Sequence, residues 1–181
     1  MLFRSIANAG HMRLVVGCTL NPPEVEAIRK GHDLRALVEA KLVTVPLDPP
    51  DEAARQGLEL LAWMIANGTL EVKVAIPMDR DGNPTPAEGI YHAKVGIIKD
   101  SGENRLAFSG SINETAAGWR KNSETFHVYC SWSETRHVEY DEKSFDRLWN
   151  GRTHTVCVMD VPEAVKLRLL EIGRASCRER V

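Results

Sequence analysis

Residues 90–113 decide the fold class, and they read IYHAKVGIIK (90–99), DSGEN (100–104) and RLAFSGSIN (105–113). The first and third stretches are short and apolar, whereas the second consists of small and polar residues that favour a turn. The sequence therefore predicts two strands, Ile90 to Lys99 and Arg105 to Ser109, joined by the loop Asp100 to Asn104. On an extended strand, His92 and Lys94 lie two positions apart and project from the same face.

Helical and strand patterns alternate on both sides of this stretch. Short apolar or alternating runs predict further strands at 12–18, 70–76, 123–132 and 155–159. Apolar spacing and end signals predict helices at 24–30, 33–43, 51–66, 113–119, 138–149 and 161–170. The end signals include Asn21 before two prolines and Gly68 after the clearest helix. This order predicts an α/β sandwich around a mixed β-sheet.

Composition limits the class of protein. With 181 residues, 43% of them hydrophobic and 27% charged, the chain suits one soluble globular domain that buries roughly 70% of its unfolded surface. No apolar run approaches the ~18 residues that a membrane-spanning helix needs, and residues 1–12 lack the apolar core of a secretory signal. The four cysteines form no CxxC pair, which argues against a structural zinc site and favours buried thiols in the cytoplasm.

The two ends of the chain differ from the part between them. Residues 171–181 read EIGRASCRERV, and they resemble the translation of a common short-read sequencing adapter. Residues 2–5 read LFRS and resemble the reverse complement of the same adapter. We therefore expect 1–5 and 171–181 to be adapter-derived scars, and 6–170 to be a domain from a longer protein.

The charge balance restricts how the domain can bind nucleic acid. The net charge is −2, and four of the arginines lie in the two end segments, so the remainder is mildly acidic. Bulk charge would therefore repel nucleic acid, and binding must rely on a local basic patch.

The residues that carry chemistry lie in three short segments. His92 and Lys94 place a nucleophile beside a cation, which suits an anionic phosphate. Residues 110–113 (GSIN) lie where a strand meets the start of a helix, so their hydroxyl, amide and free backbone N–H groups can cradle phosphate oxygens. Glu124 begins the next strand and can orient an imidazole by accepting its second N–H.

This combination resembles the phospholipase D superfamily, whose signature is HxK, a variable spacer, GSxN and an acidic residue after a short helix. The matching positions are His92, Lys94, Gly110, Ser111, Asn113 and Glu124. The likeness covers most of 12–170 and is most specific over 90–132. It implies a phospholipase D-like α-β-α sandwich around a mixed β-sheet, of which this chain supplies one half-unit.

The resemblance also implies a reaction. In the family, the motif histidine attacks phosphorus and forms a phosphohistidine, a second histidine protonates the leaving oxygen, and water releases the phosphate, without a metal or other cofactor. Carried over by position, the nucleophile is His92, the phosphate ligands are Lys94, Gly110, Ser111 and Asn113, and the residue that orients the histidine is Glu124. The longer signature has an aspartate five positions after the lysine. Lys99 occupies that position here, and Asp100 follows it.

The chain contains a single HxK. The other histidines lack a lysine two positions later; they are His11, His32, His127, His137 and His154. A complete site needs two copies of the motif, so we expect a homodimer with the site on its two-fold axis. A second copy elsewhere in the parent protein would serve equally.

The resemblance implies a nucleic-acid substrate, because family members with one motif per chain are commonly nucleases. The wording of 106–119 (LAFSGSINETAAGW) is most similar to phospholipase D-like domains of bacterial DEAD/DEAH-type or Swi/Snf-type helicases, which are also found beside restriction systems. We therefore expect a DNA nuclease domain of a helicase or defence protein, with the helicase C-terminal to it. The alternatives are a DNA-binding module without turnover and a lipid phosphodiesterase, although no basic amphipathic helix suggests a membrane surface.

Some residues allow a plainer interpretation. For Trp119 and Trp132, packing is favoured over stacking on bases, and Trp63 and Trp149 are most simply helix core. For Arg120 and Lys121, a DNA backbone contact and a solvated turn are both open.

Overall fold

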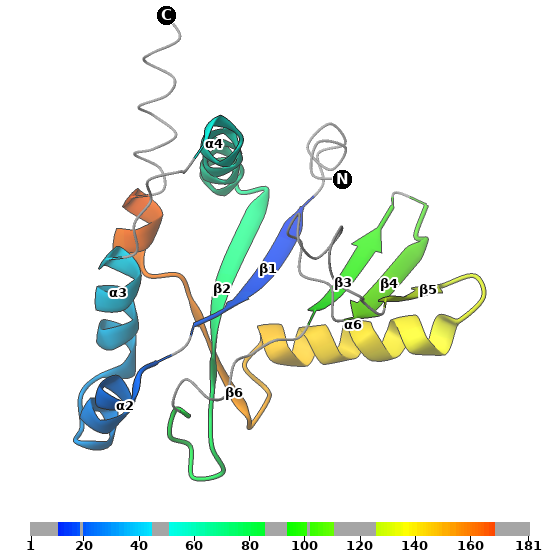
Figure 1. Ribbon diagram of the computed structural model, residues 1–181. Helices are drawn as coiled ribbons and strands as arrows, with labels where there is room; N and C mark the ends of the chain where they lie inside the picture. Colours follow the sequence, from blue (N-terminus) through cyan, green and yellow to red (C-terminus); the bar gives the residue numbers. More distant parts are fainter. Residues whose placement is uncertain are drawn as a thin grey trace, which may run out of the picture.

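The computed structural model describes residues 11–18, 20–44, 51–85, 94–100, 102–110 and 126–168 (Figure 1). The elements are β1 (Met12–Gly17), α2 (Pro22–Arg29), α3 (Leu34–Thr44), α4 (Glu52–Ala66), β2 (Leu70–Pro77), β3 (Lys94–Lys99), β4 (Arg105–Gly110), β5 (Phe126–Cys130), α6 (Thr135–Trp149) and β6 (Val156–Asp160). Residues 163–168 are also helical. The predicted α/β class is confirmed. Residues 90–93 and 123–125 of two predicted strands, the predicted helix 113–119 and the two chain ends lie outside the described residues.

The helix starts follow the capping signals in the sequence. The Asn21 side chain accepts a hydrogen bond from the Glu24 backbone N–H at 2.9 Å, and the Glu24 carboxylate accepts one from the Asn21 N–H at 2.6 Å. This reciprocal pair satisfies two N–H groups that the first turn of α2 leaves open. At the start of α4, Asp51 accepts from the Ala54 N–H at 2.8 Å.

The end of β5 and the start of α6 differ from the prediction. The strand was expected to reach residue 132, and the helix was expected to begin at residue 138. Instead, the Cys130 carbonyl accepts hydrogen bonds from the N–H groups of Ser133 and Glu134, which turns the chain directly after β5. The Thr135 hydroxyl then donates to the Ser131 carbonyl at 2.6 Å, and α6 begins there. Side-chain hydrogen bonds of this kind override a weak alternation of apolar residues.

The described strands form two three-stranded sheets, where one mixed sheet was expected. In the first, β2 lies between β1, which is parallel to it, and β6, which is antiparallel. In the second, β4 lies between β3 and β5, and both pairs are antiparallel. Within the described ranges, no hydrogen-bonded ladder joins β1 to β3, and the two sheets are connected by the helix that packs on both of them.

The first sheet lies between two helical layers. One face packs against α2, α3 and the helical residues 163–168 (Figure 1). The buried side chains of this core are Cys18, Leu20, Val25, Val38, Val74, Ile76 and Val161. On the other face, Arg13 and Lys73 lie 5.3 Å and 4.9 Å from the ring centre of Trp149, at the end of α6. Burying both faces of β2 explains why Ala75 and Ile76, neighbours of opposite orientation, are both fully buried.

Helix α6 is a layer shared by the two sheets, because it contacts β3, β4 and β5 as well as β6. Its inner side is apolar: Val138, Leu148 and Trp149 are buried. The core position predicted for Trp149 is therefore confirmed. The same prediction for Trp63 is wrong, because that side chain on α4 is 47% exposed.

An ion-pair cluster fastens α6 to the β3–β4 hairpin. The Glu142 carboxylate lies 2.8 Å from Lys99 Nζ and 2.6 Å from a guanidinium nitrogen of Arg105. Burial of the Glu142 carboxyl raises its pKa, but the hydrogen bonds and charges of Lys99 and Arg105 outweigh this effect and leave the pKa below its usual value.

Replacing Glu142 with glutamine is expected to reduce both stability and its pH dependence. At pH 7 we expect a loss of about 1–3 kcal/mol, since two cations lose their charged acceptor. Because the pKa of Glu142 is lower in the folded protein than in the unfolded chain, its carboxylate stabilises the fold fully at pH values above the unfolded pKa of about 4.5. This stabilisation is lost as the pH falls through the folded-state pKa. Urea unfolding at pH 7 and pH 3 should therefore show a smaller acid-induced loss of unfolding free energy in the variant.

Glu139→Gln is the control, because Glu139 forms an exposed ion pair with Lys143 at 3.6 Å. An equal loss from both substitutions would contradict the prediction.

None of the helices in the described ranges combines the length and the apolar character that crossing a bilayer demands.

Candidate functional site

Residues that belong to, or follow closely, three motif segments lie in one row of the second sheet. In the antiparallel register, Lys94 is the Cα partner of Gly110, and Gly110 is the partner of Phe126. These residues form the last row of the sheet among the described residues, and we call them the terminal row. The register therefore places Lys94 of the HxK segment beside Gly110 of the GSxN segment, with Phe126 on the other side of Gly110.

Four predicted site residues lie outside the described residues, namely His92, Ser111, Asn113 and Glu124. In the sequence they are one to three positions from the terminal row. Ser111 follows Gly110 directly, and His92 and Glu124 precede Lys94 and Phe126 by two positions. Of the predicted site, the structure thus places the backbone of Lys94 and Gly110 side by side.

The face of the sheet to which position 94 belongs is opposite α6. Residues alternate between faces along a strand, so Lys94 shares its face with Gly96 and Ile98. The ring of Phe108, the cross-strand partner of Gly96, covers this glycine so closely that a Cβ there would overlap it. On the other face, Ala107 is fully buried and Lys99 reaches Glu142 of α6. By register, position 94 therefore belongs to the face of the sheet away from α6.

The opposite end of the hairpin contains the aspartate that is displaced from its signature position. Asp100 accepts hydrogen bonds from the backbone N–H groups of Gly102 and Asn104, at 2.8 Å and 2.9 Å, and from the Asn104 side chain at 2.9 Å. The side-chain hydrogen bond from Asn104, followed by the backbone ones, lowers the pKa of Asp100. Asp100 thus closes the β3–β4 loop, one position beyond the Lys99–Arg105 row, which is five rows from Lys94 and Gly110.

Two other histidines, His127 and His137, stack on the ring of Tyr129 near the candidate site. His127 of β5 stacks on Tyr129 with ring centres 6.4 Å apart, and Tyr129 stacks on His137 of α6 at 4.5 Å. Next along α6, burial raises the pKa of Asp141. Because His127 alternates with Phe126, it belongs to the face that α6 covers, and position 94 belongs to the other face. His127 is thus unsuited to act beside Lys94.

Potential metal ligands are dispersed in the part of the chain that the structure describes. There, no three His, Cys, Asp or Glu side chains lie together as a metal site requires.

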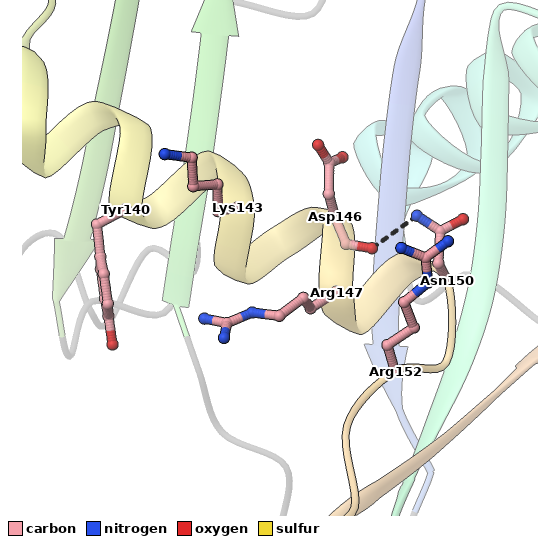
Figure 2. A pocket seen from close by; sticks show the side chains of 6 residues that line it. All are labelled: Tyr140, Lys143, Asp146, Arg147, Asn150 and Arg152. Carbon is pink, nitrogen blue, oxygen red and sulfur yellow. Dashed lines mark hydrogen bonds between the residues drawn. The ribbon is translucent and has the colours of Figure 1, made fainter.

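One surface was missed by the sequence interpretation. A shallow depression on the outer side of α6 is lined by Tyr140, Lys143, Asp146, Arg147, Asn150 and Arg152 (Figure 2). The signal was available in the sequence, because Arg136, Tyr140, Lys143 and Arg147 are spaced four, three and four residues apart, as on one helix face. Nearby, Trp132 is 67% exposed, so the packing favoured for it is not found.

Comparison of the chain with protein-family models, with curated proteins and with solved structures finds no match.

Proposed function

We propose that the chain is a phospholipase D-like half-unit that cleaves DNA phosphodiesters without a metal, through a phosphohistidine at His92. The observation that carries the proposal is the terminal row Lys94–Gly110–Phe126. In this row Lys94 of HxK lies beside Gly110 of GSxN, and Phe126 lies two positions after Glu124 in the sequence. The likeness in sequence and the register both support a single phosphate site.

Chain length limits how far the motif residues can be from each other. Cross-strand partners in antiparallel sheets have Cα atoms about 4.5–5.5 Å apart. Each further residue adds at most about 3.6 Å. Since Asn113, the most distant, is three positions from Gly110, every motif residue stays within roughly 11 Å of the row. Such distances are short enough for histidine, lysine, serine and asparagine side chains to meet at one phosphate.

In the proposed reaction, the His92 imidazole attacks phosphorus and forms a P–N bond as the P–O bond to the leaving nucleoside breaks. A second histidine donates a proton to that leaving oxygen. Water then attacks the phosphohistidine, the P–N bond breaks, and the second histidine takes the proton from water. Lys94, Ser111, Asn113 and the backbone N–H groups near Gly110 stabilise the negative charge on the phosphoryl oxygens. Glu124 accepts the second N–H of the His92 ring and orients it.

The second histidine has to come from another half-unit. We propose that it is His92 of a second copy, in a homodimer whose two-fold axis passes through the site. A second half-site in a longer parent chain is the alternative source. In the proposed biological setting, the domain is cytoplasmic and belongs to a bacterial helicase or a restriction or defence protein, with the helicase domain on its C-terminal side.

The proposal is tested by incubating the full chain with end-labelled single- and double-stranded oligonucleotides in excess EDTA. We expect cleavage, and an alkaline quench should retain a protein–DNA adduct that acid treatment releases, because phosphohistidine is labile to acid. Cleavage that requires added Mg²⁺ would overturn the proposal. DNA binding without cleavage, by a folded dimer, would replace it with a catalytically silent DNA-binding module. Hydrolysis of phospholipid vesicles in place of DNA would change the substrate to a lipid.

A further inference from the structure

The outer face of α6 carries a row of cations with an aromatic ring among them. Arg136, Tyr140, Lys143 and Arg147 occupy roughly 60° of the helix circumference, at 100° per residue. Arg152 follows the helix and lines the same depression (Figure 2). We call these five residues the α6 outer face. It runs along the helix for about 16 Å, from Arg136 to Arg147.

This face is fully available to solvent. The buried residues of α6, Val138, Leu148 and Trp149, lie on the opposite side of the helix. The Tyr140 side chain is 66% exposed, although a tyrosine of a soluble domain commonly packs its ring. The side chain of Lys143 is 75% exposed. An exposed aromatic ring between cations adds nothing to the stability of a solvated helix, so we look for a ligand that would cover it.

The positive charge of this face is largely unneutralised. Asp146, the nearest acidic residue towards the helix end, is engaged by Arg13 at 3.1 Å, and Glu139 lies 3.6 Å from Lys143. Arg147 donates to the neutral Ser144 hydroxyl at 3.3 Å. Across the described ranges, Arg136, Arg147 and Arg152 form no ion pair. A chain with a net charge of −2 thus concentrates free arginines at one place.

We infer that the α6 outer face binds single-stranded nucleic acid, with arginines on the phosphates and the Tyr140 ring stacked on a base. Guanidinium groups match phosphate geometry, and exposed aromatic rings between cations are the usual platform for unpaired bases. This is the local basic patch that an acidic domain needs in order to hold DNA. The inference rests on the proposed function for the identity of the ligand, and it does not depend on catalysis by His92.

The structure favours nucleic acid over an anionic membrane. A helix that binds a bilayer inserts its apolar face below the headgroups. The apolar face of α6 is already buried against both sheets, so only the polar side is free. The exposed Trp132 lies four residues before Arg136 in the sequence, in the turn between β5 and α6.

The test measures binding of a fluorescein-labelled dT20 oligonucleotide by fluorescence anisotropy, in EDTA and at several salt concentrations. The double variant Arg136→Glu/Arg147→Glu should weaken binding at least tenfold. The control is Arg29→Glu/Arg35→Glu, which makes the same charge change at exposed positions of α2 and α3 and should weaken binding less than about twofold. Substituting alanine at Arg136, Arg147 and Arg152 should make the slope of log K against log salt shallower by about 2, at ~0.7 per phosphate contact.

Tyrosine variants separate stacking from charge. Tyr140→Ala should weaken binding of dT20 about tenfold and leave the salt slope unchanged, whereas Tyr140→Phe should bind like the wild type because the ring is kept. Binding of dT20 is measured without reference to cleavage, so a chain that binds dT20 and does not cleave it distinguishes a failure of catalysis from a failure of this surface. The inference is overturned by any of three results: equal losses from the α6 and control pairs, no binding of dT20 at 50 mM salt, or binding only to phosphatidylserine vesicles or a poly-glutamate peptide.

Discussion

Substituting alanine for His92 is expected to lower the rate of DNA cleavage at least about 10⁴-fold. Loss of a covalent nucleophile removes the whole route through the phosphohistidine, and isolated nucleophile deletions in other enzymes have effects of this size or larger. The measurement is single-turnover cleavage of an end-labelled oligonucleotide in EDTA. The protein–DNA adduct should disappear with the activity.

The matched control is His127→Ala. His127 is an exposed histidine of β5 that pairs with Ser109, one row from Gly110, and it belongs to the face that α6 covers. Its substitution should change the rate less than about twofold. Equal losses in the two variants would show that the sheet face has been assigned wrongly.

Mixing wild-type protein with the His92→Ala variant reveals where the second histidine comes from. If each site contains His92 from two copies, wild-type protein equilibrated with excess His92→Ala should lose activity as the square of its fraction, because mixed dimers are inactive. A linear dependence of activity on the fraction of wild-type protein would show that one chain holds all the catalytic residues. That result would contradict the proposed homodimer and leave the phosphohistidine intact.

A Trp149→Ala protein is expected to lose about 3–5 kcal/mol of its free energy of unfolding, a large share of the stability of a domain of this size. Trp149 is 7% exposed, and Phe145 stacks on it with ring centres 5.9 Å apart. Lys73 Nζ also donates to the Trp149 carbonyl at 3.2 Å. The ring therefore anchors the end of α6 to the first sheet while the rest of the helix covers the second.

Urea denaturation followed by circular dichroism measures this loss. Trp63→Ala, at an exposed position of α4, should cost less than about 1 kcal/mol and serves as the control. A loss below 1 kcal/mol for Trp149→Ala, with an unchanged dependence on urea, would show that α6 is held by its other contacts.

Local structure was predictable from the sequence to the extent that local interactions determine it. The capping box at Asn21 and the apolar run of β2 each act within a few residues, and their elements were found where expected. The turn after Cys130 was not foreseen, because it depends on side-chain hydroxyls that compete with the strand. The division into two sheets depends on long-range packing of α6, and no local pattern encodes it.

The location of the candidate site was predictable from the sequence only in part, and its chemistry stays a prediction. The motif residues could be chosen from their types and order, but the register that pairs Lys94 with Gly110 is set by the length of the 100–104 loop and its Asp100 hydrogen bonds. The α6 outer face was overlooked because its members are common surface residues. They become distinctive only when Asp146 is seen to be occupied by Arg13.

The position of β2 between β1 and β6 has a consequence for biosynthesis. About 80 residues separate the end of β2 at Pro77 from the start of β6 at Val156. At ~5–20 residues per second, a nascent chain emerging from the ribosome spends several seconds with the apolar strand LEVKVAIP unpaired along one side. During that interval the strand is open to intermolecular pairing, so chaperone capture of the nascent chain should matter most between these two points of translation.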